Sequence, residues 1–529
     1  MTPHCRRNKP RRRSGLRGLL AATLLAAATT PVAGQGDADK ALVVKAAVIH
    51  LGDGRTVEGG AIVIRGGRIA AVGSGVEIPA DATVIELAGA NVTPGLIDAN
   101  AAVDSYDLMP TPTLSLGHAP SPGSAAASSD VEVEGGDKGE HGGAGDHTHA
   151  HVHSADPATV TAGAGFGYLS ADAHVEAGYD HSSCFLCGGA LMHDELTTAA
   201  GVRVGLSQTE HAAEVIPHTR ALDAIDLNAP DFSRLLSQGV TTVYVGGDPG
   251  AVISSRGAIL RTGGDAASRV VKPESAVRAV MGSDSYRVGA GNRLPFRGPA
   301  SMYTRRPTTR MGVAWVFRKA FYDAQRWADG VGIHGADAPP VEAMPYLIGV
   351  LKGEIPLRIQ ARMQHDIEAA LRLSDELGLS FTLEEGTQAY ECLGALKDRG
   401  VPVVFGPIYE QAPGRRGWSG EAAGARLHTF KALLDAGIET ALSAQELRDE
   451  DGLARQAMYA RRFGAELDDV VRSVTATPAK LLGIDGDTGT IEAGKRADVI
   501  VWSGAPFAAT SRPVVVVVGG RVQVDRRPG

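Results

Sequence analysis

The stretch Val92-Thr93-Pro94-Gly95-Leu96-Ile97-Asp98-Ala99 separates two parts of the chain that differ in pattern. Before it, residues 41–92 alternate apolar and polar side chains between glycine turns, and residues 61–65 and 68–72 form a predicted hairpin around a glycine pair. After it, apolar strands alternate with helical segments. Near the end, residues 488–525 return to the first pattern. The predicted strands there are residues 498–502, 514–518 and 521–524. We therefore expect both ends of the chain to build one β-rich module.

The middle of the chain consists of apolar strands followed by helical segments. The predicted strands are residues 239–245, 355–359, 380–383, 401–405 and 438–442. The helix after the second of these strands has an apolar stripe of Ile367, Ala370, Leu371 and Leu377. Strands that are apolar along their whole length and alternate with helices indicate a parallel sheet, either closed as a barrel or left open.

Composition and charge exclude several classes of protein. The chain has 529 residues, 43% of them hydrophobic, which is enough for a large core plus a smaller module. Its net charge of −8, with no basic stripe beyond the first residues, argues against a nucleic-acid partner. The sequence also has no nucleophile elbow, no phosphate-binding loop of the Walker type and no His-Glu-x-x-His helix.

The first residues have the three regions of an export signal. Basic residues up to Arg17 precede a short apolar run over residues 16–28, and Val32-Ala33-Gly34 forms a cleavage site before Gln35. The apolar run is too short to cross a bilayer comfortably, and no other segment is suitable, so no membrane span is expected. We therefore predict a signal peptide over residues 1–34 and a periplasmic or secreted mature protein.

Residues 110–165 are rich in Pro, Gly, Ser, Ala and His and have no periodicity, which is typical of a disordered insertion. An irregular excursion over residues 166–230 follows it. The insertion carries alternate histidines at His147, His149, His151 and His153. Neutral imidazoles in a flexible loop can bind Zn²⁺, Cu²⁺ or Ni²⁺ with little selectivity, and the alternative is a solvated linker.

Cys184 and Cys187 form a Cys-x-x-Cys pair with histidines nearby at His181 and His193. Two thiolates and two imidazoles suit tetrahedral zinc, although this spacing is not that of a standard zinc finger. In an oxidising compartment the two cysteines can instead form a disulfide. Free thiols are the third alternative, and the sequence leaves all three open. Cys392 is interpreted as a small buried apolar residue.

Three motifs, in their order along the chain, carry a resemblance to a known family. Residues 92–99 resemble the first barrel strand of the amidohydrolase superfamily, residues 476–484 its last barrel helix, and residues 489–499 its return into a β-sandwich. Residues 307–312 and 385–387 resemble the imidazolonepropionase-like branch. The resemblance implies an α/β fold, a (β/α)8 TIM-like barrel plus a small β-sandwich built from both chain ends, with the site at the carboxyl ends of the strands.

The same resemblance sets the expected domain boundaries. The β-sandwich would comprise residues 35–92 and residues 488–529. The barrel would comprise residues 93–487, interrupted by the insertion at about 110–165 and the excursion at about 166–230.

Active members of this superfamily bind one or two divalent metals, usually zinc, which activates water and polarises the scissile carbonyl. Their ligands are a His-x-His pair on strand 1, one His each on strands 5 and 6, and an Asp on strand 8. The corresponding residues in this sequence are Asn100 and Ala102, Gln360, Glu385 and Gln445. Amide side chains bind zinc poorly compared with imidazole or carboxylate, and alanine cannot bind it, so no metal is expected in the barrel.

The distribution of histidine agrees with this loss. After His218 only His334, His365 and His428 remain, and none of them falls at a predicted strand end. The remaining polar candidates for the pocket are Asp98, Asn100, Glu384, Glu385, Gln445 and Glu446. Glu385 with a second carboxylate has the groups for acid–base catalysis, and the alternative is that these side chains are hydrogen-bonded remnants.

Three functions follow from these observations. The first is a non-catalytic amidohydrolase homologue that binds a small-molecule ligand or an active amidohydrolase paralogue. The second is a hydrolase of carbon–nitrogen bonds in cyclic amides or imidazolones, with a divalent metal such as zinc held by atypical ligands. The third is an exported metal-binding protein that works through its His-rich loop. A homo-oligomer is compatible with each.

Overall fold

The computed structural model describes residues 40–103, 213–247, 249–287, 307, 309–333, 338–409, 421, 424–445 and 452–527. Several predictions lie outside these residues: the signal peptide over 1–34, the insertion at 110–165, the Cys184–Cys187 pair and Glu446. Within the described residues, no helix combines the length and the apolar character needed to cross a bilayer.

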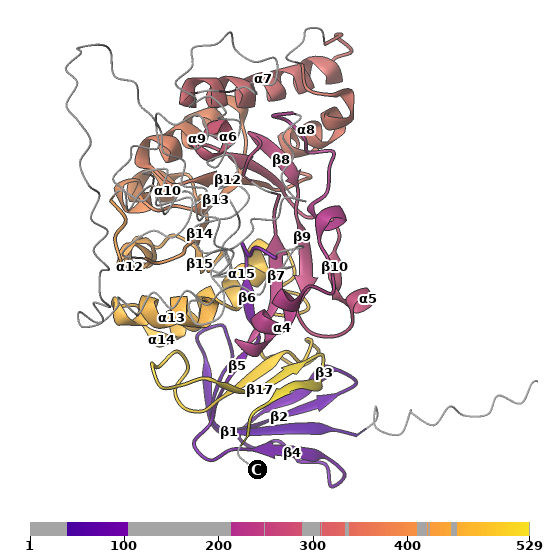
Figure 1. Cartoon of the computed structure of the whole chain (residues 1–529). Coiled ribbons are helices and arrows are strands. Elements are labelled where there is room, and N and C mark those ends of the chain that lie inside the picture. Colours follow the sequence, from indigo (N-terminus) through magenta and orange to yellow (C-terminus); the bar gives the residue numbers. More distant parts are fainter. Residues whose placement is uncertain are drawn as a thin grey trace, which may run out of the picture. The chain divides into compact units, whose positions relative to one another are not determined.

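Strands from both ends of the chain form one eight-stranded sheet, as the alternating patterns predicted (Figure 1). The strand order is β18-β17-β16-β5-β1-β2-β3, and β4 pairs with β1. The predicted hairpin is β2 and β3, and the two ends of the chain meet where β16 runs antiparallel to β5, with Val499 opposite Pro94. The strands are β1 (Leu42–His50), β2 (Thr56–Arg65), β3 (Arg68–Gly73), β4 (Thr83–Glu86), β5 (Asn91–Pro94), β16 (Val499–Trp502), β17 (Pro513–Val518) and β18 (Arg521–Asp525).

The rest of the described chain is a mixed α/β arrangement with two sheets. One has the order β10-β9-β7-β6, and the other β15-β14-β13-β12-β11-β8. Strands β6 and β7 are parallel, and β11 to β15 are parallel in succession. The strands are β6 (Leu96–Asp98), β7 (Val240–Val245), β8 (Ile253–Arg256), β9 (Ala258–Arg261), β10 (Val270–Lys272), β11 (Val277–Val280), β12 (Leu357–Ala361), β13 (Phe381–Glu385), β14 (Val403–Phe405) and β15 (Thr440–Leu442).

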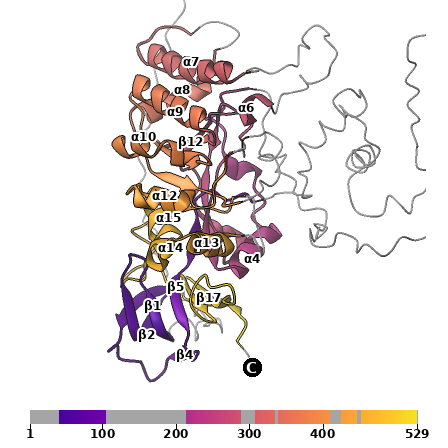
Figure 2. The ribbon, with the colours of Figure 1, turned by 90° about the vertical axis from the view of Figure 1, so that its left-hand side faces the viewer.

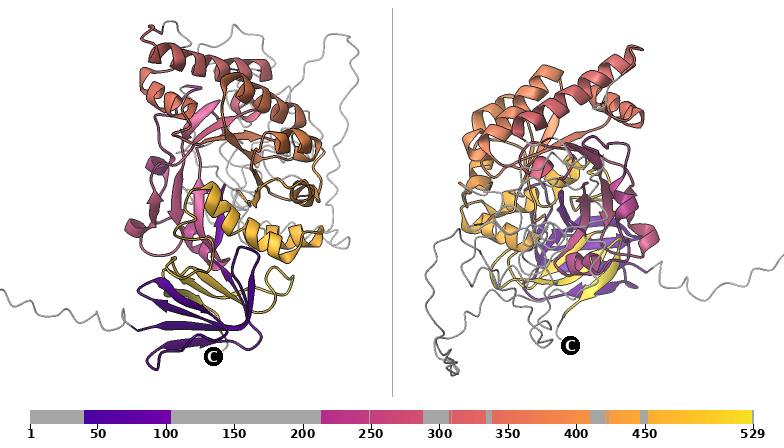
Figure 3. Two further views of the ribbon diagram at one scale, coloured as in Figure 1. Left: turned by 180° about the vertical axis from the view of Figure 1, so that it is seen from behind. Right: turned by 45° about the horizontal axis from the view of Figure 1, so that its top comes forward.

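Helices cover the parallel strands. In Figure 2, α7, α9, α10 and α12 lie along one side of the strands, and Figure 3 shows the magenta strands on the opposite side from the orange helices. The helices are α4 (Pro230–Ser237), α5 (Ala266–Arg269), α6 (Asp284–Arg287), α7 (Arg310–Ala328), α8 (Met344–Leu351), α9 (Gln364–Leu377), α10 (Leu393–Asp398), α12 (Thr429–Asp435), α13 (Leu453–Arg462), α14 (Leu467–Ser473) and α15 (Ala476–Leu481). Short 3₁₀ turns span Ala221–Ala224, Val341–Ala343 and Ala389–Glu391.

Helix α9 shows how the apolar pattern places these helices. The predicted stripe of Ile367, Ala370, Leu371 and Leu377 is buried against the sheet. The helix ends at Gly378, whose φ of 68° is left-handed and suits a residue without a Cβ. Because α9 directly follows β12, its packing holds the carboxyl end of that strand in place.

Several strand boundaries differ from the sequence prediction by one or two residues, and those of β12 and β13 concern the site. The strand expected at 355–359 lies at Leu357–Ala361, because Pro356 has no N–H with which to enter the ladder. The strand expected at 380–383 continues to Glu385. Charged residues at the end of β13 broke the apolar pattern, yet they are buried and paired, as described below.

The mixed α/β class is confirmed, but a closed barrel is not. Backbone hydrogen bonds group the described strands outside the eight-stranded sheet into two separate sheets. Among these strands, no strand pairing connects the two sheets into one closed ring. The (β/α)8 barrel therefore stays a prediction. Cys392 is buried, as predicted, between a 3₁₀ turn and α10.

Candidate functional site

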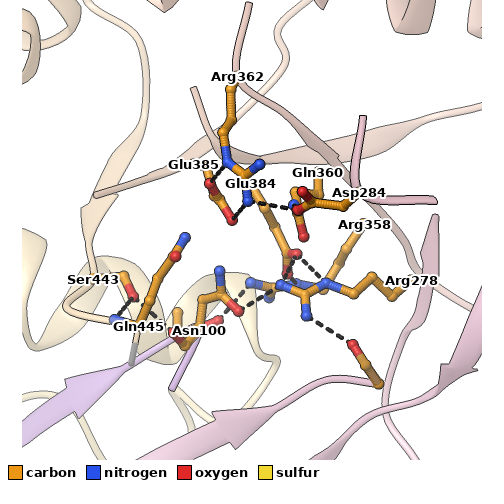
Figure 4. A network of polar contacts seen from close by, with 12 residues as sticks. Asn100, Arg278, Asp284, Arg358, Gln360, Arg362, Glu384, Glu385, Ser443 and Gln445 are labelled. Atoms are coloured by element: carbon orange, nitrogen blue, oxygen red, sulfur yellow. Dashed lines mark hydrogen bonds and ion pairs between the residues drawn. The ribbon is translucent and has the colours of Figure 1, made fainter. Parts of the chain in front are cut away.

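The polar residues predicted from the sequence converge at the carboxyl ends of four strands (Figure 4). Asp98 ends β6, Gln360 lies near the end of β12, Glu384 and Glu385 end β13, and Gln445 follows β15. All five side chains are buried. A backbone bond from the Ala102 N–H to the Gln445 carbonyl, 3.2 Å long, joins the first and last of these strand ends. We refer to this region as the strand-end site.

Asp98 connects β6 to the loop after β15. Its Oδ1 accepts from the Ser443 hydroxyl at 2.6 Å and from the Asn100 N–H at 3.0 Å, and its Oδ2 accepts from the Ala444 N–H at 3.0 Å. Burial raises the pKa of this carboxyl above its usual range, and the three hydrogen bonds oppose that rise without cancelling it. Asp98 is therefore used to hold two strand ends together.

Two buried arginines that the sequence reasoning missed bracket Glu384. Arg278 on β11 donates from Nε to Glu384 Oε2 at 2.7 Å, and Arg358 on β12 donates from Nε to Glu384 Oε1 at 2.5 Å. Burial alone would raise the pKa of Glu384, but the two guanidiniums outweigh it and hold that pKa below its usual value. Glu384 is fully buried and ionised at neutral pH.

The other donors of these arginines are also occupied. Arg278 donates to the Gly247 carbonyl and to Asn100 Oδ1, both at 2.8 Å, and Arg358 donates to the Ala99 carbonyl. The Arg358 guanidinium lies 4.2 Å from the centre of the Tyr244 ring, a cation–π distance. The pair is thus held by the strands and loops on each side of it.

A third missed arginine, Arg362, gathers three carboxylates. It hydrogen-bonds Glu385 through Nε and Nη2, Asp284 Oδ2 at 2.7 Å and Glu421 Oε2 at 2.9 Å. Burial opposes the charge on Arg362, but Asp284 and Glu385 raise its pKa well above the usual value. Gln360 donates to the same Asp284 oxygen at 2.8 Å, so it serves the ion-pair network.

The side chains at the strand ends do not fit a divalent metal. Within the part of the chain that the structure describes, no three His, Cys, Asp or Glu side chains are placed to share one ion. The carboxylates that could contribute ligands accept hydrogen bonds from Arg278, Arg358 and Arg362 instead. Each guanidinium supplies the positive charge that these carboxylates require. It also stays protonated, so it cannot itself coordinate a metal.

Two buried amide groups have donors to spare. Asn100 Nδ2 and Gln445 Nε2 have no hydrogen-bond partner within the described structure. Arg278 fixes the orientation of the Asn100 amide. Asn100 Oδ1 must face the Arg278 guanidinium in order to accept its hydrogen bond, so Nδ2 points away from Arg278. In Figure 4 both amide groups extend toward the side on which Glu385 and Arg362 lie. Gln445 also has a φ of 53°, an unfavourable backbone conformation for a residue with a side chain.

The histidines do not contribute to this network. His365 is in the first turn of α9, with about half of its side chain exposed. His428 immediately precedes α12. His334 lies outside the described residues.

A sequence signal for the missed arginines exists. Arg358 and Gln360 alternate along β12, and Arg362 follows with the same spacing just after the strand ends; this is the period with which side chains share one face of a strand. An arginine inside an otherwise apolar strand needs a buried partner, because such a charge is rarely buried unpaired. The carboxylates Glu384 and Glu385 on the next strand are those partners. The pairing also places Gln360 opposite Glu384 in register.

Comparisons with known proteins agree with this arrangement of strands. Residues 422–523 match the Amidohydrolase family. Amidohydrolase tasK of Hapsidospora irregularis is 24% identical over 63% of this chain, and the chain spans only about a third (35%) of that protein. Imidazolonepropionase of Rhizobium meliloti (strain 1021) is 25% identical over 59% of this chain and 69% of its own length.

This chain resembles the amidohydrolase superfamily in its sequence and in its fold. The amidohydrolase from Thermotoga maritima MSB8 has the same fold, with a TM-score of 0.63 and 23% identity over 92% of this chain and all of that one. The resemblance to the imidazolonepropionase-like branch is confirmed as well. The strand-end site thus lies where the strands β6, β12, β13 and β15 end, with arginines among its carboxylates.

Proposed function

We propose that this protein is a non-catalytic member of the amidohydrolase superfamily that binds a small molecule at the strand-end site. The observation that carries the proposal is the buried network of Arg278, Arg358 and Arg362 with Glu384 and Glu385. An ion-pair network of this kind takes up the carboxylates that catalysis would use, and it rigidifies the strand ends around a ligand.

Hydrolysis of an amide needs a polarised carbonyl and an activated water. Glu385 is the carboxylate best placed to act as a base, but Arg362 donates to both of its oxygens. Hydrogen bonds to the ionised form stabilise it and make it a weaker proton acceptor. Asp98 accepts three hydrogen bonds and is equally occupied. The geometry therefore favours hydrogen-bonded remnants over an acid–base pair.

The two spare amide donors define what the ligand offers. A buried donor without an acceptor costs about 1–3 kcal/mol, so an oxygen acceptor delivered by a ligand gains that amount. Asn100 Nδ2 and Gln445 Nε2 would both donate to a carbonyl or carboxylate oxygen. We infer a ligand with such an oxygen, held within a (β/α)8 barrel of which β6, β7 and β11 to β15 supply parallel strands.

The names of the relatives keep a second function open. The names imidazolonepropionase and amidohydrolase suggest hydrolysis of a cyclic amide. In this chain that reaction would require a divalent metal such as zinc, held by atypical ligands. A non-catalytic homologue could also bind an active amidohydrolase paralogue instead of a small molecule. Export and a metal-binding role for the His-rich loop remain proposals from the sequence.

Metal analysis separates these functions. The mature protein with residues 137–156 deleted, which removes the His-rich loop, is incubated with zinc, desalted and analysed by mass spectrometry. We expect less than roughly a tenth of a metal per chain. Near one metal per chain, retained after replacement of Cys184 and Cys187, would support the hydrolase instead and would contradict the proposal.

Ligand binding is then measured by thermal shift against a panel of small amides, lactams and carboxylates. Asn100→Leu and Gln445→Leu remove the spare donors at similar volume, and both should abolish the shift of any hit. Gln325→Leu, at an exposed position of α7, is the matched control and should bind like the natural protein. Hits that survive both site substitutions would place the ligand elsewhere.

A further inference from the structure

A cavity of about 330 Å³ lies near the start of β7, away from the strand-end site. It is lined by residues of β7, β9, β10 and the segment that follows α15. Its polar lining consists of Thr242, Arg261, Lys272, Asp487, Thr488 and Arg496 together with Asp498. None of these residues belongs to the arginine–glutamate network, so the cavity is independent of the proposed function.

The carboxylates at this cavity already have cationic partners. Asp498 accepts from Arg496 Nε at 3.0 Å and 3.2 Å and from the Gly519 N–H at 2.7 Å. Asp487 lies 2.9 Å from Arg68 Nη1. Both acids are therefore neutralised by arginines other than Arg261.

Arg261 is left with little compensation. The distance from its Nη2 to Asp487 Oδ2 is 3.6 Å, too long for a hydrogen bond, and no other ion pair or hydrogen bond of its guanidinium occurs within the described residues. Its side chain is 22% exposed, so it lies mainly inside the protein. Burial, with Arg496 and Arg68 nearby, lowers the pKa of Arg261 below its usual value.

Lys272 adds a further positive charge on the same wall. Its Nζ donates to the carbonyls of Leu482 and Gly483, which close the end of α15, at 3.1 Å and 2.7 Å. An ammonium has three donors, so one remains for a ligand. Arg496 pairs with Asp498, and Arg68, which does not line the cavity, pairs with Asp487, so the charges of Arg261 and Lys272 are an excess of two.

We propose that this cavity is a binding site for a small dianion with a phosphate or dicarboxylate group, contacted mainly by Arg261. A guanidinium offers a planar fork that matches two oxygens of such a group, and charge-assisted hydrogen bonds of this type are strong. Thr242 and Thr488 line the cavity and supply hydroxyl donors for the remaining oxygens. Two negative charges on the ligand balance the excess charge of the cavity.

Isothermal titration of the full chain with inorganic phosphate tests the proposal, with succinate as a separate arm and ionic strength held constant with NaCl. We expect one saturable site for at least one of the two dianions, and which one binds identifies the ligand chemistry. Arg261→Ala should weaken that binding by about tenfold or more, the loss of one strong charged contact. Arg372→Ala removes an exposed arginine of α9 and should bind like the natural protein.

Three outcomes would overturn the proposal: no saturable heat with either dianion, equal weakening by both alanine variants, or unchanged binding by Arg261→Ala. Circular dichroism establishes that each variant is folded. If Arg261→Ala does not fold, crystals of the natural protein soaked in phosphate or succinate decide the matter. Density for the anion beside Arg261 supports the site, and density only elsewhere refutes it.

Discussion

Replacing Glu384 by Gln tests the central feature of the strand-end site. Glu384 is fully buried between Arg278 and Arg358, each of which donates to a different carboxylate oxygen. A glutamine keeps the shape but offers one oxygen and turns an N–H₂ group toward the second guanidinium. Two buried positive charges then lack their counter-charge. Breaking a buried ion pair by removing one partner costs about 3–5 kcal/mol, which is the expected loss of unfolding free energy at pH 7.

The control is Glu376→Gln, the same substitution in a partly exposed cluster. Glu376 on α9 accepts from Arg318 at 2.7 Å and 2.8 Å and from the Tyr322 hydroxyl at 2.7 Å. Arg318 and Tyr322 hold the pKa of Glu376 at about 2, yet solvent screens the pair. Exposed pairs contribute about 0.2–1 kcal/mol, so this variant should lose far less stability.

The assay is urea denaturation followed by circular dichroism at pH 7 and at decreasing pH. The pKa of Glu384 is lower in the folded state than in the unfolded chain, so its ionisation stabilises the fold above its ordinary pKa. That stabilisation is lost as the pH falls through the folded pKa. The difference between the natural protein and Glu384→Gln should therefore be largest at neutral pH and shrink in acid. A loss at pH 7 no greater than that of Glu376→Gln would refute the ion-pair account.

Three further substitutions test other parts of the site by the same assay. Arg362→Met removes the guanidinium that Glu385, Asp284 and Glu421 share, so it should cost about 3–5 kcal/mol at pH 7. A loss no greater than that of Glu376→Gln would contradict this. Gly406 has a φ of 142°, and a Cβ added there in Gly406→Ala meets the carbonyl oxygen of Ser443, so the unfolding free energy should fall by about 1–3 kcal/mol. An unchanged urea midpoint would contradict this clash. Tyr244→Phe removes a buried hydroxyl that has no partner among the described residues, so stability should stay the same or rise, and a loss above about 1 kcal/mol would reveal a hidden partner.

The sequence predicted the elements and their grouping well where local physics decides them. Alternation and glycine turns identified β2 and β3 as a hairpin, and continuous apolar runs identified β7 and β12 to β15. Pairing of the two chain ends followed from their shared pattern and was confirmed by β16 beside β5. These features depend on the period of side chains along a strand, which a sequence displays directly.

The ends of the strands were predicted less well for a related reason. Glu384 and Glu385 read as a break in the apolar pattern, yet β13 continues through them. A buried carboxylate is tolerated only when cations from other segments pair with it, and those cations lie 23 to 106 residues away in the chain. No local pattern reports such a distance.

The sequence by itself determined the resemblance to the amidohydrolase superfamily and the likeness of both chain ends, and it predicted that the histidine and aspartate ligands are replaced at the aligned positions. It also named Asp98, Asn100, Gln360, Glu385 and Gln445 as residues that meet. Only the tertiary structure decided what they meet. Arg278, Arg358 and Arg362 come from two different strands and the loop after one of them, and their charges become meaningful only when folding removes water and brings carboxylates within hydrogen-bonding distance. Electrostatics between segments remote in sequence depends on distance and burial, and these two quantities exist only in the folded chain.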